Sequence, residues 1–317
     1  MKIAYIVLAY KNPDQLYRLI QTLINKDSAF YLHIDKKSNI SDFKGVLSKL
    51  NKSAKLTLLP RINSYWGGPG ILTAILHGLD KILHDGNYNR IVLISGQDYP
   101  IKSISYIFDY FETNEGKNFI PYFKLPSEIW GEEGMTRIKN YHFRIHGKIY
   151  TYPPVSSPIH IYSKIFYKLL KIRFRKPREF PEGLQPYGGF SGWKITADAA
   201  KEVMDFINKR PDYLKYHKYT KCADEIFFQT ILLNSKNEAL RNTFINDDLT
   251  FIKWKENMPN PEVLTKSDFD AIKKTNALFA RKFDSRIDSE ILDMIDKKIL
   301  VTCTGLRFFC HYSLSDN

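Results

Sequence analysis

Cysteine is scarce in this 317-residue sequence, and long apolar runs are absent. The three cysteines, Cys222, Cys303 and Cys310, are odd in number and too few for a disulfide framework. No apolar stretch approaches the ~18 residues that a membrane-spanning helix needs. The start, MKIAYIVLAYKNP, lacks a small-residue cleavage site and is more typical of a buried strand than of a signal peptide. These absences predict a cytoplasmic protein without a membrane-spanning anchor.

Sequence motifs of several large protein classes are also missing. There is no GxxxxGK[ST] phosphate loop, no GxGxxG after a strand and no GxSxG nucleophile elbow. Helix-turn-helix, zinc-finger and RNP-like strings are absent, and no His/Cys spacing suits zinc. We therefore expect neither a nucleic-acid partner nor a zinc centre, although the chain carries 47 Lys and Arg against 34 Asp and Glu. The resulting net charge of +13 leaves an anionic membrane or a phosphate-bearing substrate as candidate partners.

Strand-like and helix-like stretches alternate over roughly the first 110 residues. Apolar runs typical of buried strands are followed by amphipathic segments, the first of which begins at Asn12-Pro13. The predicted strands cover 3–9, 30–35, 56–60 and 90–96. This alternation predicts an α/β fold with a mostly parallel, Rossmann-type sheet flanked by helices. No long linker interrupts the chain, so we expect a single domain over 1–317, with a nucleotide-binding half (1–112) and an acceptor-binding, catalytic half (113–317).

Candidate ligand-binding residues follow the predicted strands. Ligands of such sheets bind beyond the carboxyl ends of the strands, where HID (33–35), YWGG (65–68) and SGQDYP (95–100) should meet. Asp35, after His33, either forms an Asx turn or accepts hydrogen bonds from a ligand such as a uridine. Asp98 has the same two interpretations. Trp66 either packs in the core or forms the floor under a ring.

Two further strings carry charges suited to catalysis. Asp224 and Glu225 begin a predicted helix over 223–234, where a carboxylate either complements the helix dipole or faces a cleft. At most one of them can face a cleft squarely. Arg281 and Lys282 form either an exposed pair or two cations within reach of a diphosphate.

An Asp-x-Asp metal motif has one close match, Asp268-Phe269-Asp270. It follows Thr265 and Ser267, so it indicates a helix start rather than a strand end. We expect no metal site there.

Seven strings in a fixed order resemble a known family. They are HIDKKS, WGG, LISGQDYPIKS, GGFSGWKIT, ADEIFFQTILLNS, DDLTFIKW and LFARKFDSRIDSEIL. Together they resemble the core-2/I-branching β-1,6-N-acetylglucosaminyltransferases and peptide O-xylosyltransferases, from about residue 3 to residue 300. The match is weakest between 113 and 185.

The resemblance implies a GT-A-type fold and a metal-independent, inverting transfer from a UDP-sugar to a hydroxyl. Glu225 matches the family's general base, and Arg281 and Lys282 match the basic residues that neutralise the departing UDP. His33, Asp35, Trp66 and Asp98 would line the donor site. The family's upstream phosphate-binding arginine has no counterpart in ENMPNPEVL.

The donor sugar and acceptor follow less directly from the resemblance. Gly192 stands where xylosyltransferases carry an additional aspartate, which favours UDP-GlcNAc over UDP-xylose as donor. Acceptor contacts are expected from the central segment and its neighbours, listed here: Glu132, Glu133, Arg137, Lys139, Gly192 and Trp193. Because the chain lacks the anchor and cysteines of the family's Golgi members, it resembles a bacterial version acting on a glycan or lipid-linked saccharide. A xylosyltransferase and a non-catalytic nucleotide-sugar-binding protein are the alternatives.

A basic segment, residues 164–178, lies outside every one of these motifs. It holds seven Lys and Arg and no acidic residue, with Ile165 and Leu169 on one helical face. It predicts either a solvated helix or a surface that docks on an anionic membrane, which would place the enzyme peripherally on the inner face of the cell membrane.

Overall fold

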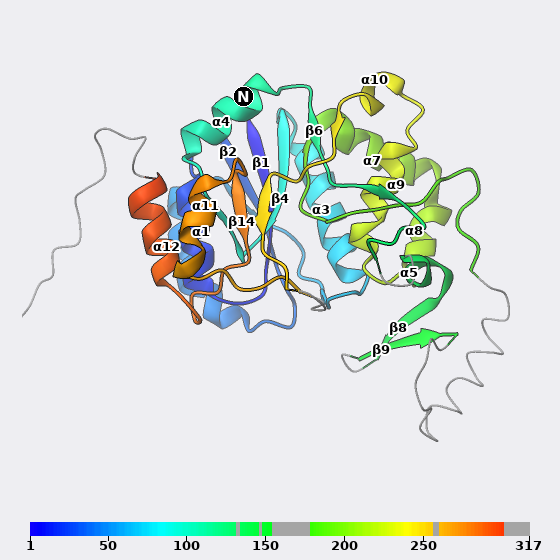
Figure 1. The fold of residues 1–317 in the computed structure, drawn as a ribbon, viewed down its shortest axis with the longest axis horizontal. Coiled ribbons are helices and arrows are strands. Elements are labelled where there is room, and N and C mark those ends of the chain that lie inside the picture. Colours follow the sequence, from blue (N-terminus) through cyan, green and yellow to red (C-terminus); the bar gives the residue numbers. More distant parts are fainter. Residues whose placement is uncertain (131–133, 146–147, 154–177, 256–259, 301–317) are drawn as a thin grey trace, which may run out of the picture.

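A seven-stranded sheet forms the centre of the computed structural model (Figure 1). The structure describes residues 1–130, 134–145, 148–153, 178–255 and 260–300. The strand order is β12-β6-β11-β4-β1-β2-β3. The bounds are β1 Ile3–Ala9, β2 Ser28–Ile34, β3 Leu56–Leu58, β4 Arg90–Ser95, β6 Asn118–Phe119, β11 Lys194–Thr196 and β12 Phe244–Ile245. All neighbours pair in parallel except β11, which runs antiparallel to both β4 and β6. The predicted mostly parallel α/β sheet is confirmed.

Helices cover both faces of this sheet (Figure 1). Alternate residues of β1 enter opposite cores: Tyr5 and Val7 on one face, Ala4 and Ile6 on the other. The first face packs against α1 (Pro13–Leu23), α2 (Lys44–Ser53), α4 (Ile104–Thr113), α11 (Phe269–Lys274) and α12 (Glu290–Ile295). The second packs against α3 (Gly70–Asp85), α7 (Ala197–Lys209), α8 (Pro211–His217), α9 (Phe227–Leu233) and α10 (Glu238–Arg241). Burial on both faces explains the continuous apolar strands of the sequence.

A second, three-stranded sheet brings two distant motifs together. Its order is β13-β14-β5, with β13 over Thr250–Ile252, β14 over Phe279–Arg281 and β5 over Asp98–Pro100. Antiparallel pairing sets Arg281 opposite Asp98. Strands β12 and β13 lie close in sequence but belong to different sheets.

The helix predicted over 223–234 is also divided. Residues Ala223–Glu225 form a 3-10 turn, and Ile226 leaves helical geometry (φ −128°) before α9 begins. Glu225 therefore lies in a separate turn and not in the first turn of α9. Shorter helical turns cover Ile40–Phe43, Lys266–Asp268 and Asp296–Leu300.

The middle of the chain is more regular than its composition predicts. It contains α5 (Met135–Lys139), the pair β7 (Phe123–Lys124) and β10 (Tyr187–Gly188), and a hairpin of β8 (Tyr141–Ile145) with β9 (Lys148–Tyr152). The hairpin lies away from the central sheet, at the lower right of Figure 1.

The predicted membrane features are only partly within the described residues. No helix among these residues is long and apolar enough to cross a membrane. Residues 164–177 of the basic segment lie outside the described residues. Arg178 is described, and it is 7% exposed and donates hydrogen bonds to the carbonyls of Asn140, Tyr216 and Tyr219. This arginine stabilises the fold and offers no charge to a membrane.

Candidate active site

The residues at the end of β2 hold the loop that leads to Trp66. His33 is 1% exposed, and its Nε2 accepts a hydrogen bond from the Ile62 amide at 3.1 Å. Burial lowers the pKa of this ring, which keeps it neutral. His33 therefore positions the loop from within the fold, and its predicted direct contact with a donor is wrong for a ring this deeply buried.

Asp35 holds the same loop from the other side. Its Oδ1 accepts from the Lys37 amide at 2.8 Å, which is the Asx turn anticipated from the sequence. Its Oδ2 accepts from the Ser64 amide at 3.2 Å and lies 3.3 Å from the Lys37 ammonium. The turn alternative is confirmed, and a uridine contact by this carboxylate stays a prediction.

Trp66 lies beside the turn that carries Glu225. Its side chain is 49% exposed, so the core-packing alternative is wrong. The next carbonyl, of Gly67, accepts a hydrogen bond from the Cys222 amide at 3.2 Å, and Arg144 donates to the Trp66 carbonyl. The Lys221 ammonium is 5.8 Å from the centroid of a Trp66 ring. The WGG string, which follows β3, and the residues just before Glu225 thus lie side by side.

Glu225 forms an ion pair with Arg137. The Arg137 Nη1 is 2.5 Å from Glu225 Oε2, and the two side chains are 23% and 24% exposed. The guanidinium lies 3.7 Å from the centroid of a Trp130 ring, which fixes its plane. Arg137, predicted as an acceptor contact, is thus a direct partner of the predicted base.

The two adjacent carboxylates differ in access. Burial raises the pKa of Glu225, and Arg137, Arg281 and Lys221 oppose that shift. Asp224 is 6% exposed, and burial together with the charge of Glu225 raises the pKa of Asp224. Glu225 is therefore the carboxylate of this pair that solvent or a substrate can reach.

Arg281 and Asp98 face each other across the small sheet. Arg281 Nε is 3.5 Å from Asp98 Oδ1, and neither atom makes a hydrogen bond within the described residues. The other Asp98 oxygen accepts from the Ser95 amide. The Arg281 guanidinium lies 4.8 Å from the Phe190 ring centroid. Arg281 is thus held by charge to Asp98, and its Nε has no hydrogen-bond acceptor in the described part of the chain.

Lys282 extends this positive region. Burial lowers the pKa of Lys282, as do the charges of Arg281 and Lys11. Lys11 is itself 2.6 Å from the carboxylate of Asp284. Lys282 is thus close enough to Arg281 for the two cations to influence each other, as binding of a diphosphate by both would require.

The predicted acceptor contacts separate into different environments. Trp193 has 0% exposure and packs against Phe228 at 5.3 Å, so it is a core residue and its predicted acceptor contact is wrong. A Cβ at Gly192 would lie 2.4 Å from the Phe190 ring, so an aspartate there would displace that ring. Lys139 is exposed at the end of α5. Glu132 and Glu133 lie outside the described residues.

Lys194 was missed in the sequence, although a lysine within the apolar string GWKIT is a signal. It is 1% exposed and donates to the Gly192 carbonyl at 2.8 Å, to Thr250 Oγ1 at 2.7 Å and to the Asp248 carbonyl. Burial lowers its pKa to about 8. Lys194 therefore fastens β11 to the loop before β13.

The Asp-x-Asp string lies at a helix start, as predicted. Asp268 forms a capping box with Thr265 and an ion pair with Lys253 at 2.8 Å. Within the described ranges, no three His, Cys, Asp or Glu residues form a group that could hold a metal ion.

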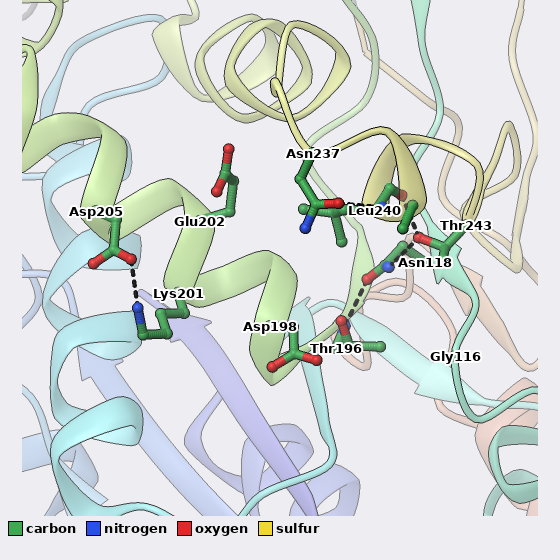
Figure 2. Close-up of a pocket in the computed structure, with 11 residues that line it drawn as sticks. Gly116, Asn118, Thr196, Asp198, Lys201, Glu202, Asp205, Asn237, Leu240 and Thr243 are labelled. Carbon is green, nitrogen blue, oxygen red and sulfur yellow. Dashed lines mark hydrogen bonds and ion pairs between the residues drawn. The ribbon is translucent and has the colours of Figure 1, made fainter.

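A cavity of about 470 Å³ lies between α7 and α10, at the amino ends of the parallel strands (Figure 2). Several of its polar groups bind one another: Asn118 joins Thr243 to the Thr196 amide, and Lys201 pairs with Asp205. It contains none of the predicted site residues, so it is separate from the candidate active site.

Known proteins resemble this chain over most of its length. The Core-2/I-Branching enzyme family matches residues 3–273. A xylosyltransferase of Ciona intestinalis is 22% identical over 94% of this chain and 34% of its own length. Human xylosyltransferase 1 is 21% identical over 93% and 30%, respectively. This chain spans about a third of the length of these relatives.

Solved structures show weaker similarity. The S. aureus TarS 1-349 complex with UDP is 11% identical, with a TM-score of 0.38, covering 86% of this chain and 63% of that one. The TarS 1-349 complex with UDP-GlcNAc is 14% identical, with a TM-score of 0.30, covering 45% and 39%. Scores this low carry no weight here, whereas the family match covers most of the chain and agrees with the ordered motifs. The chain belongs to the Core-2/I-Branching enzyme family.

Proposed function

We propose that this chain is an inverting glycosyltransferase that moves a sugar from a UDP-sugar to a hydroxyl of an acceptor sugar, with Glu225 as general base. The observation that carries the proposal is the position of Glu225, a partly exposed carboxylate that interacts with both Arg137 and Arg281. A base and a cation that act on each other are what a single displacement from a nucleotide sugar needs.

The proposed reaction is one displacement at the anomeric carbon. Glu225 takes the proton of the acceptor hydroxyl, whose oxygen forms the new bond to the anomeric carbon. The bond from that carbon to the UDP oxygen breaks on the opposite face, and UDP leaves with the electron pair. Arg281 and Lys282 stabilise the developing diphosphate charge by hydrogen bonds and charge, without a divalent metal.

Arg137 tunes the proposed base. A buried carboxyl is held protonated, and a protonated Glu225 cannot accept a proton. The Arg137 guanidinium favours the ionised form, and one carboxylate oxygen, Oε1, remains outside the 2.5 Å contact. Burial raises the pKa of Glu225 and Arg137 lowers it. This balance suits a base that works near neutral pH.

For the donor sugar, we propose GlcNAc. Gly192 allows the Phe190 ring to pack beneath Arg281. By the resemblance of its sequence, it stands where xylosyltransferases carry an additional aspartate. The named relatives are xylosyltransferases, so UDP-xylose is the second candidate. We propose as acceptor a glycan or lipid-linked saccharide of bacterial surface polysaccharide synthesis.

Membrane docking by the basic segment remains part of the proposal. Without the buried Arg178, six Lys and Arg residues remain over 164–176. Liposome flotation with and without anionic lipid tests it, and equal flotation in both would contradict docking.

A donor screen that follows UDP release tests the proposed function. We expect UDP-GlcNAc to give the fastest release, and we expect the rate to persist in excess EDTA. Glu225→Gln should abolish transfer and retain UDP binding, which also separates an enzyme from a non-catalytic binding protein. The exposed Glu238→Gln on α10 is the matched control. Activity lost in EDTA and restored by manganese would contradict metal independence.

A further inference from the structure

A second cavity, of about 720 Å³, lies between α4 and the edge strand β13. It is lined by two tyrosines of α4, the segment around β13 and the turn before β14. These residues are Tyr106, Tyr110, Asp247, Leu249, Thr250, Phe251, Ile252, Thr275, Asn276 and Ala277. None belongs to the candidate active site, and the volume is within the range of small-molecule sites.

Two tyrosines form an aromatic surface in this cavity. Their rings are 6.5 Å apart with an interplanar angle of 25°, and Tyr106 is 46% exposed. Tyr110 packs in turn against Phe111 at 5.9 Å and Phe119 at 5.8 Å, both of which are buried. Packing against the core thus fixes the Tyr110 ring. The Tyr106 ring lies against the Tyr110 ring, and nearly half of Tyr106 is exposed to solvent.

Polar groups suited to hydroxyls surround these rings. Asp247 accepts the Leu249 amide at 2.7 Å through Oδ1, which orients the carboxylate. Burial, and then the charge of Asp247, raise the pKa of Tyr110, so Asp247 lies near the aromatic pair. The Thr275 carbonyl is held by Lys102 at 2.8 Å, which stabilises the turn that carries Asn276.

The charge of the lining favours a neutral ligand over an anionic one. The whole chain has a net charge of +13, yet these ten lining residues include one carboxylate and no lysine or arginine. The ammonium groups of Lys102 and Lys194 each donate to a lining residue, Thr275 and Thr250 respectively, while Asp247 would repel a nucleotide or a phosphate. A neutral, hydroxyl-rich ligand with one apolar face fits both the rings and the polar groups.

We propose that this cavity is a second saccharide-binding site, which holds a neutral sugar unit of a glycan outside the active site. The C–H face of the sugar packs on Tyr106, and Asp247 and Asn276 bind its hydroxyls. Lys194 joins this cavity to the active site, because it binds both Thr250 of the lining and the Gly192 carbonyl. The inference rests on the proposed function only for the choice of a glycan as ligand.

Calorimetric titration of tetrasaccharides tests this site directly. Homo-oligomers of GlcNAc, galactose, glucose and xylose are titrated into Glu225→Gln protein saturated with UDP, so that turnover is absent and the nucleotide site is filled. We expect at least one oligomer to bind. Adding Tyr106→Ala should weaken it about fivefold to tenfold, whereas Tyr106→Phe, which keeps the ring, should bind as the parent does. Thermal unfolding and UDP affinity should be unchanged in both variants.

Two outcomes would overturn the site: no oligomer binds to the UDP-saturated protein, or Tyr106→Ala binds the oligomer as tightly as its parent. Failure of the two proposals is distinguishable. Loss of the Tyr106 effect in an active enzyme contradicts only this site. Tyr106-dependent binding in a protein without transfer activity contradicts only the proposed function.

Discussion

The regions beyond the two ends of the parallel strands differ in how their polar groups are paired. In the cavity at the amino ends, Asn118, Thr243 and the Thr196 amide bind one another, and Lys201 and Asp205 are paired (Figure 2). Beyond the carboxyl end of β4, Arg281 Nε and Asp98 Oδ1 are buried 3.5 Å apart, and neither makes a hydrogen bond within the described ranges. A buried polar atom without a partner costs about 1–3 kcal/mol. A cavity alone is therefore a weaker sign of function than polar groups held ready and unsatisfied.

The largest expected effect is at Glu225. Glu225→Gln keeps the shape of the side chain but removes its ability to take a proton, so kcat should fall by about 10²–10⁴-fold. Steady-state kinetics with UDP-GlcNAc measures the loss. The remote Glu238→Gln should retain wild-type kcat, and a comparable loss there would show that the effect is not specific to the cleft.

Arg281 comes next. Arg281→Ala removes a cation with unused donors, and we expect kcat/KM to fall by about 10²–10³-fold. Affinity for UDP, measured by calorimetry, should weaken as well. Arg286→Ala, close in sequence and outside the small sheet, is the control. Unchanged UDP affinity in Arg281→Ala would rule out a diphosphate contact.

Arg137 should alter the pH dependence more than the maximal rate. The cation lowers the pKa of Glu225, so Arg137→Ala raises that pKa and moves the acidic limb of the kcat profile to higher pH. The loss should be larger at pH 6 than at pH 8, and Arg137→Lys should restore part of the profile. A uniform loss at all pH values would instead indicate an acceptor contact.

The smallest expected effect is that of Lys194 on the free energy of unfolding. Its pKa is about 8 in the fold and 10.5 when unperturbed, so the unfolded chain binds more protons between these values. The free energy of unfolding of the wild type, relative to Lys194→Met, should therefore rise by about 1–3 kcal/mol as pH goes from 8 to 10.5. It should be flat below pH 8. Urea titrations across this range provide the measurement, and a difference independent of pH would mean that Lys194 does not deprotonate.

Local patterns in the sequence predict the helices and strands of the molecule, but not the side-chain contacts between residues far apart in the chain. The buried run of β1 and the Asn12-Pro13 start of α1 depend on neighbouring residues, and both are found as predicted. The pairing of Glu225 with Arg137 joins residues 88 positions apart, which no local pattern encodes. Trp193 lies within the string GGFSGWKIT and is predicted as an acceptor contact, yet its ring packs in the core.

Local patterns also do not predict the backbone conformation on either side of Glu225. The helix predicted over 223–234 has continuous helical periodicity, but Cys222 adopts a left-handed conformation (φ 51°) and Ile226 departs from helical geometry (φ −128°, ψ −36°). These angles direct Glu225 away from α9, towards Arg137. The contact between Cys222 and Gly67 that accompanies this turn is tertiary, so only the assembled fold determines it.

The anomeric configuration of the first product tests the central claim most directly. The donor UDP-GlcNAc has an α linkage, and a single displacement assisted by Glu225 must give a β-linked product. Proton NMR of the reaction at early times distinguishes a β-linked from an α-linked product. A β-anomeric signal from wild type, absent with Glu225→Gln, is the result that we predict. An α-linked product would contradict single displacement and the assignment of Glu225 as its base.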